Sequence, residues 1–236
     1  MSKMIGETEV AVKNDNTRRS FLHRGTVLTA AGGTMVALAA VTVAKANDND
    51  GKDGDNDSNS DEHREVKANF VAIQKHENDH VAFLVNALGA MARPKPTFHN
   101  LHQPSRRMFK QTSQALENTG CGAYLGAAPA LFSRAYLAAA GSIALIEARH
   151  AGWLDSLLGD PITQNVSAQA PSFEIPLTAA QVVTLASPFV ASLNGGPPLT
   201  YSTTPSAAND IAILNFALAL EYLEAEFYNL NVPQLF

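Results

Sequence analysis

Two Glu-x-x-His pairs are the residues whose types and spacing most clearly allow chemistry. They are Glu77 with His80, and Glu147 with His150. Residues three positions apart lie on the same face of a helix, so each pair can offer a carboxylate and an imidazole to one metal ion. A single pair of this kind is more often a polar surface pair. Two pairs on separate helices favour a metal site.

Two single glutamates, Glu117 and Glu221, complete the pattern. Each lies in phase with apolar neighbours on a further predicted helix. An unpaired charge in a protein core is very costly, so buried carboxylates imply a partner. Four carboxylates and two imidazoles from four helices are the ligand set of di-iron and di-manganese carboxylate bundles, and oxygen-rich ligation suits these metals. The sequence therefore predicts two iron or manganese ions, with the ligands Glu77, His80, Glu117, Glu147, His150 and Glu221.

Four helices with apolar residues at spacings of three and four must position these ligands. The first begins at Val66 and ends before Gly89, and the second begins after a capping residue, Ser105. The third runs from about residue 131 to 158, where Gly159 starts the stop signal. The last spans residues 211–230 and has Asp210 as its expected cap.

The stretch from Ile162 to Asn209 is rich in Pro, Ser, Thr and Gly, and only Thr178 to Ala186 has a short helical pattern. A connection this long in a compact domain indicates a crossover along a bundle. The predicted fold class is therefore an all-α four-helix bundle that covers residues 66–236, with a long crossover before the last helix.

Residues 1–46 have the order of parts of a twin-arginine export signal. Arg18 and Arg19 precede an uncharged apolar run from Gly25 to Val43, and Ala44-Lys-Ala46 offers small residues for cleavage. An uncleaved membrane anchor is the alternative, because such a run can just span a bilayer. Cleavage of this signal peptide would send the mature protein to the periplasm or cell envelope without stable membrane insertion.

Residues 47–65 are strongly acidic and have almost no apolar residue, which predicts a disordered linker. Asp53, Asp55 and Asp57 alternate as in a calcium loop. However, Ser58 stands where such a loop needs Gly, and Arg64 stands where it needs Glu. The linker is therefore the better interpretation.

Composition excludes two further classes of protein. The formal net charge of -5 and the sequence pI near 5.8 argue against a basic surface for nucleic acid. A single cysteine, Cys121, excludes a disulfide framework within the chain.

Several longer stretches carry a resemblance to a known family. They are residues 76–84, 122–129, 142–151, 173–178 and 213–228. In these stretches the chain resembles the exported ferritin-like domain family that includes the desiccation-related proteins. The resemblance implies a ferritin-like bundle and the same six ligands, with Glu224 as a substitute for Glu221.

The order of the helices differs from that family. The helix with Leu-Glu-Tyr-Leu-Glu-Ala-Glu-Phe-Tyr usually opens the domain, whereas here it closes the chain, as after a circular permutation. A bundle tolerates this order if the chain ends lie close together. The last helix can then dock in its own chain, or in a neighbouring chain to form a homodimer by exchange.

Two classes of function remain open at this level. The first is a redox enzyme with oxidase, ferroxidase or peroxide-consuming activity, for which dioxygen or peroxide is the small-molecule substrate. The second is a metal-poor or metal-free protective or structural stress protein of the cell envelope, in which any bound metal acts as a folding staple.

Overall fold

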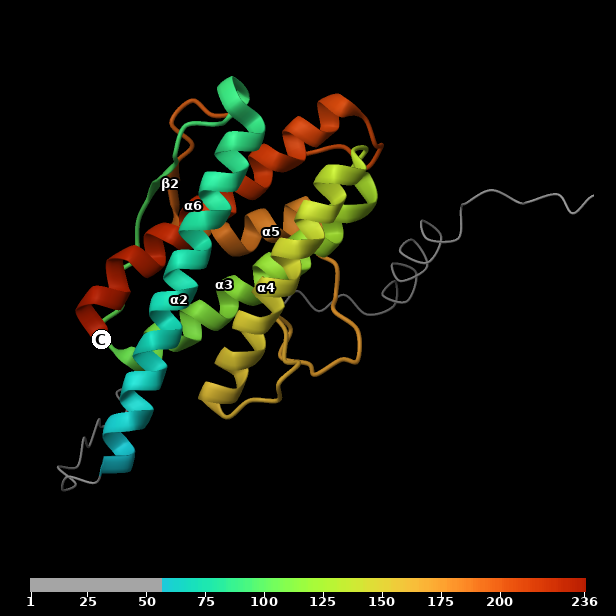
Figure 1. Ribbon diagram of the computed structural model, residues 1–236. Helices are drawn as coiled ribbons and strands as arrows, with labels where there is room; N and C mark the ends of the chain where they lie inside the picture. The colour runs from blue at the N-terminus through green and yellow to red at the C-terminus, as the bar shows by residue number, and fades with distance from the viewer. Residues whose placement is uncertain (1–56) are drawn as a thin grey trace, which may run out of the picture. The chain divides into compact units, whose positions relative to one another are not determined.

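The computed structural model describes residues 57–236. The predicted export signal at 1–46 and the first part of the predicted linker, residues 47–56, lie outside the described residues. Within the described range, the four long helices are α2 (Asp57–Leu88), α3 (Arg106–Ala127), α4 (Arg134–Leu158) and α6 (Ala207–Leu235). They pack together as an all-α bundle, which confirms the predicted fold class (Figure 1).

The bundle consists of two helix pairs, because α2 packs along α6 and α3 packs along α4. Aromatic and aliphatic side chains fill the space between the pairs. The largest apolar or aromatic side chains that are fully buried are Phe70, Phe109, Leu154, Val182, Leu218, Leu223, Phe227 and Tyr228. No helix in the described part of the chain combines the length and apolar character that a bilayer span requires.

The predicted cap at Ser105 and the predicted helix ends at Leu88 and Leu158 agree with the structure, whereas the starts of α2 and α6 differ from the prediction. The Ser105 side chain accepts a hydrogen bond from the backbone N–H of Met108, as a helix cap does. Gly159 ends α4 in the left-handed conformation, with φ of 78°. However, α2 begins at Asp57 rather than Val66, so residues 57–65 are helical and not linker. Acidic residues are favourable in the first turns of a helix because they complement its dipole.

The start of α6 also differs from the sequence-based expectation. Ser206, not Asp210, caps the helix by accepting the backbone N–H of Asn209 at 3.1 Å. Asp210 lies one turn inside the helix, and its two carboxylate oxygens accept the backbone N–H groups of Phe132 and Ser133 at 2.7 and 2.9 Å. Asp210, the expected cap, therefore links the last helix to the connection between α3 and α4.

The long connection between α4 and α6 is a crossover, as predicted, and it runs from the lower end of α4 to the upper start of α6 in Figure 1. It contains α5 (Ala179–Ala186), which begins with a capping box formed by Thr178 and Gln181. Other short elements were not predicted, because they depend on tertiary contacts. These are the 3-10 turns Gly89–Met91, Ala128–Ala130 and Ser187–Phe189, and the antiparallel strands β1 (Thr97–Phe98) and β2 (Val190–Ser192).

Candidate metal centre

Six acidic and imidazole side chains meet in the middle of the bundle, and every long helix contributes. Glu77 and His80 project from α2, Glu147 and His150 from α4, Glu117 from α3 and Glu221 from α6. The four glutamates are at most 1% exposed. The structure thus brings together all six residues that the sequence selected.

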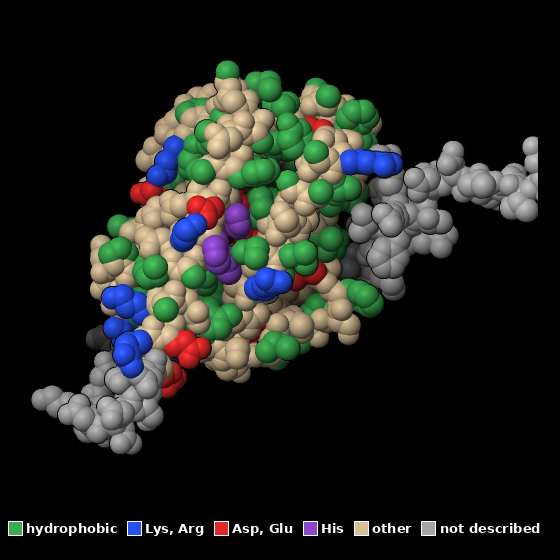
Figure 2. Space-filling view, viewed as in Figure 1, with side chains coloured by type: hydrophobic (Ala, Val, Ile, Leu, Met, Phe, Trp, Pro, Cys, Tyr) green, Lys and Arg blue, Asp and Glu red, His purple; other side chains and the backbone are tan. Residues whose placement is uncertain are grey.

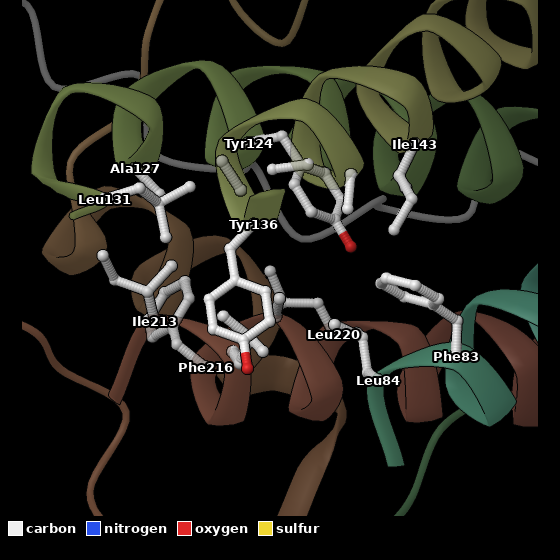
Figure 3. Close-up of a pocket in the computed structure, with 15 residues that line it drawn as sticks. Phe83, Leu84, Tyr124, Ala127, Leu131, Tyr136, Ile143, Ile213, Phe216 and Leu220 are labelled. Atoms are coloured by element: carbon white, nitrogen blue, oxygen red, sulfur yellow. The ribbon is translucent and has the colours of Figure 1, made fainter. Parts of the chain in front are cut away.

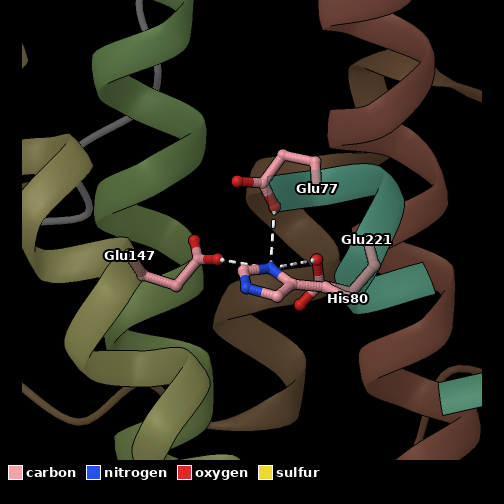
Figure 4. Close-up of side chains that lie close together, drawn as sticks. All are labelled: Glu77, His80, Glu147 and Glu221. Carbon is pink, nitrogen blue, oxygen red and sulfur yellow. Dashed lines mark hydrogen bonds and ion pairs between the residues drawn. The ribbon is translucent and has the colours of Figure 1, made fainter. Parts of the chain in front are cut away.

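His80 lies at the centre of the first group of carboxylates (Figure 4). Its Nδ1 atom is 3.0 Å from Glu77 Oε2, 3.2 Å from Glu221 Oε2 and 3.3 Å from Glu147 Oε1. A single N–H cannot donate a good hydrogen bond to three carboxylates at once. The arrangement therefore leaves carboxylate oxygens in need of another cation.

His150 occupies the corresponding place in a second group. Its Nδ1 atom is 2.9 Å from Glu117 Oε2 and 3.2 Å from Glu77 Oε1. The other ring nitrogen, Nε2, shares a 2.9 Å hydrogen bond with Nδ1 of His76, and the planes of the two rings are nearly parallel, at an angle of 4°. His76 is partly exposed, and Figure 2 shows histidine side chains at the surface between α2 and α4. This contact fixes the orientation of the His150 ring.

Two tyrosine hydroxyls donate further hydrogen bonds to the glutamates of the cluster. The hydroxyl of Tyr228 on α6 donates to Glu117 Oε1 at 2.5 Å, and the hydroxyl of Tyr124 on α3 donates to Glu221 Oε1. Each tyrosine therefore holds the glutamate of the other helix. Local sequence places a tyrosine seven residues after each of these glutamates on its own helix, but it does not predict that each tyrosine pairs with the glutamate of the other helix.

Buried oxygen atoms without a hydrogen bond are concentrated on the two glutamates of the Glu-x-x-His pairs. Within the part of the chain that the structure describes, both oxygens of Glu147 and Oε1 of Glu77 lack a hydrogen-bond partner. Glu147 Oε1 and Glu77 Oε1 have only the ion-pair contacts to His80 and His150 given above. Leaving a buried carboxylate oxygen without a partner is costly, so these oxygens fit a site that could hold a cation.

The pKa values of the cluster reflect the same shortage of positive charge. Burial alone would raise the pKa of Glu77, but its close contacts with His150 and His80 outweigh burial and lower this pKa to about 2. Burial opposes the charge of His150, yet its carboxylate neighbours raise its pKa to about 10. Burial, followed by repulsion from Glu77, raises the pKa of Glu147 well above its ordinary value. Burial also raises the pKa of Glu221, to about 7.

The ligand atoms form two overlapping groups that fit divalent cations. One consists of Glu77, His80, Glu147 and Glu221, and the other of Glu77, Glu117, Glu147 and His150; in each group the ligand atoms lie within 4.8 Å of one another. Glu77 and Glu147 belong to both groups, so they can bridge two ions. Each position offers three carboxylates and one imidazole, a donor set that suits iron or manganese better than a thiolate-bound metal.

Glu224 is the residue that the family resemblance offered as an alternative to Glu221. Within the described part of the chain it belongs to neither group. It is buried on α6 beside Gly120, and burial raises its pKa well above the ordinary value. A protonated, neutral carboxyl is the form that such surroundings favour. Of the three glutamates on α6, Glu221 is the one that belongs to these groups, and it contacts His80.

Comparison with known proteins gives one match. A family model described as a ferritin-like domain matches residues 37–160 and 209–235. The matched ranges contain all six clustered residues and omit most of the crossover. No curated protein matches the chain, and no solved structure does.

Proposed function

The chain belongs to the ferritin-like domain family, and we propose that its buried cluster binds two iron or two manganese ions for redox chemistry. The observation that carries the proposal is the set of buried oxygens on Glu77 and Glu147 that lack a hydrogen bond while they lie between two histidines. Two adjacent divalent cations would satisfy these oxygens and balance the negative charge of the four carboxylates.

The bound metals would supply the redox chemistry, and the side chains around them would hold the ligands in place. A pair of iron or manganese ions supplies two-electron exchange with dioxygen or peroxide, which defines an oxidase, ferroxidase or peroxide-consuming activity. Tyr124 and Tyr228 hold Glu221 and Glu117 in place through their hydroxyls. The apolar core around the cluster excludes water, which strengthens every charge interaction inside it.

Metal content tests the proposal directly. Protein purified without added metal, and again after anaerobic reconstitution with iron and manganese, is expected to contain about two ions per chain, the number held by di-metal carboxylate bundles. His80→Ala should lower this content, because His80 is a ligand in one of the two groups. His102→Ala is the matched control, since His102 is exposed outside the cluster, and should keep the wild-type content. Absence of metal even after reconstitution would leave the protective structural protein as the function.

We also propose export by the twin-arginine pathway to the periplasm or cell envelope. The support is the order of Arg18-Arg19, apolar run and small-residue cleavage site in the sequence. Replacing both arginines by lysine should stop export, so that the full-length protein accumulates in the cytoplasm. Fractionation followed by mass measurement of the N-terminus checks this. Export of the double variant at the wild-type level would contradict the proposal.

A desiccation-related type and a circularly permuted helix order are the finer parts of the proposal. They are supported by the sequence stretches described above and by the packing of α6, which lies along α2, the first helix of the described bundle. In the usual helix order, the helix that packs along α2 would come before α2 in the sequence. Here α6, the last helix, packs in that position. Glu221 of α6 then completes the ligand set from the C-terminal end of the domain.

A further inference from the structure

An apolar cavity lies between the four long helices (Figure 3). Its lining residue Leu84 stands four positions after His80 on α2, and Ala217 stands four positions before Glu221 on α6. Four residues make about one helical turn, or roughly 5.4 Å. The cavity is therefore the next layer of the bundle after the metal ligands.

Tyr124 joins the cavity to the cluster. The residue is part of the cavity wall, and its hydroxyl donates to Oε1 of Glu221, one of the clustered carboxylates. A molecule in the cavity is thus separated from the ligands by a single side chain. This adjacency connects the cavity to the proposed chemistry.

The cavity is small because helices pack closely around it, and it exists because much of its wall is alanine. The alanines that line it are Ala123, Ala127, Ala139, Ala140 and Ala217. The space open to a water-sized sphere is about 30 Å³. On this measure one water molecule needs roughly 10–15 Å³, so the cavity suits a ligand of two or three heavy atoms.

The wall favours an apolar ligand over a polar one. Of the 15 residues that line the cavity, only Tyr124 and Tyr136 have an oxygen in the side chain, and that of Tyr124 already donates to Glu221. Water needs two to four polar partners in a buried site, and hydrogen peroxide has two O–H groups with the same demand. Dioxygen has no hydrogen-bond donor and loses little on leaving water.

The outer end of the cavity gives such a ligand a way in. Phe83 on α2 lines the cavity and is 44% exposed, and Ala139 and Ala140 on α4 are partly exposed. We propose that this cavity binds dioxygen next to the metal cluster and that dioxygen, rather than peroxide, is the oxidant that the fold selects. The inference rests on the proposed di-metal function for its chemistry, but the cavity can be tested without metal.

Xenon is the probe for the first test, because it is apolar and enters small dry cavities. The full-length, metal-free protein under xenon pressure should bind one xenon atom at this cavity, seen by xenon NMR and by crystallography. Ala140→Leu should abolish that binding by filling the space. Ala138→Leu is the matched control, since Ala138 is exposed on the same helix, and should leave xenon bound. No xenon in the wild type, or xenon retained in Ala140→Leu, would overturn the proposal.

The second test separates the two oxidants. In metal-loaded, reduced protein, Ala140→Leu should slow the reaction with dioxygen by roughly tenfold, because the filled cavity no longer holds dioxygen next to the cluster; this factor corresponds to about 1.4 kcal/mol. The reaction with hydrogen peroxide should stay at the wild-type rate. Equal slowing of both reactions would refute the preference for dioxygen. Ala139→Leu, another partly exposed cavity position, replaces Ala140→Leu if that variant does not fold. A chain that binds xenon but no metal would refute the proposed function and retain the cavity.

Discussion

Glu147→Gln is expected to remove both metal ions and, at the same time, to stabilise the metal-free protein. Glu147 belongs to both ligand groups, and both of its oxygens are buried without a hydrogen bond in the described structure. Glutamine keeps the shape of the side chain but is a poor metal ligand, so both positions lose a bridging carboxylate. The neutral amide of glutamine can also donate hydrogen bonds to the neighbouring carboxylates. The variant thereby removes the cost of a buried carboxylate without a hydrogen-bond partner, which is about 1–3 kcal/mol.

The gain in stability should depend on pH, and its sign follows from the raised pKa of Glu147. A carboxyl whose pKa is higher in the folded than in the unfolded state destabilises the fold once the pH exceeds the unfolded value. The ordinary value is 4.5. The metal-free variant should therefore exceed the wild type in free energy of unfolding at neutral pH, and the difference should vanish as the pH falls below this value.

Metal content and urea unfolding of metal-free protein are the measurements for Glu147→Gln. Glu226→Gln is the matched control, because Glu226 is half exposed and paired with Lys95 at the surface. It should keep the full metal content and change the stability by less than about 1 kcal/mol. His80→Ala should lose less metal than Glu147→Gln, since His80 is a ligand in one group only. Full metal content in Glu147→Gln would show that this glutamate does not bridge the two positions.

Gly126→Ala is expected to destabilise the protein by about 3 kcal/mol, at the upper end for overpacking a tightly packed site. An added Cβ on Gly126 would lie 1.8 Å from the backbone oxygen of Leu177. The crossover cannot simply move away, because the backbone N–H of Leu177 donates to the oxygen of Gly122 at 2.8 Å. The Leu177 side chain is buried in the core. The gain in helix propensity from alanine is smaller than this clash.

The matched control for this prediction is Gly141→Ala. Gly141 lies in the exposed face of α4, and an added Cβ there meets nothing within 4 Å. The same substitution should therefore stabilise the protein by about 0.5–1 kcal/mol, because alanine loses less backbone entropy than glycine in a helix. Urea midpoints of the two variants measure the difference. A wild-type midpoint for Gly126→Ala would mean that the crossover does not rest on α3.

Local sequence was sufficient for the helices and for most of the residues in the buried carboxylate and imidazole cluster. Helical periodicity, the cap at Ser105 and the stop at Gly159 act within one or two turns, so they can be read without tertiary contacts. The spacing of Glu77 and His80 places both on one helix face for the same reason. The acidic start of α2 differs from the expected linker, because low hydrophobicity predicts a linker whereas acidic residues near the start of a helix complement its dipole.

Helical periodicity does not determine which of two residues on the same helix face enters the cluster, and tertiary packing decides this. Glu221 and Glu224 are three residues apart and share a helix face, so only the packing of α6 against its neighbours determines which one meets the histidines. The same packing takes Asp210 from a cap to the α3–α4 connection.

The sequence by itself thus determined which elements form and which side chains can bind metal, because these properties depend on neighbours a few residues away. Only the tertiary structure decided that Glu77 and Glu147 are shared by two groups, that Tyr124 and Tyr228 each hold a glutamate of another helix, and that an apolar cavity adjoins the cluster. These features arise between helices far apart in the chain. Their geometry depends on how side chains fill a common core.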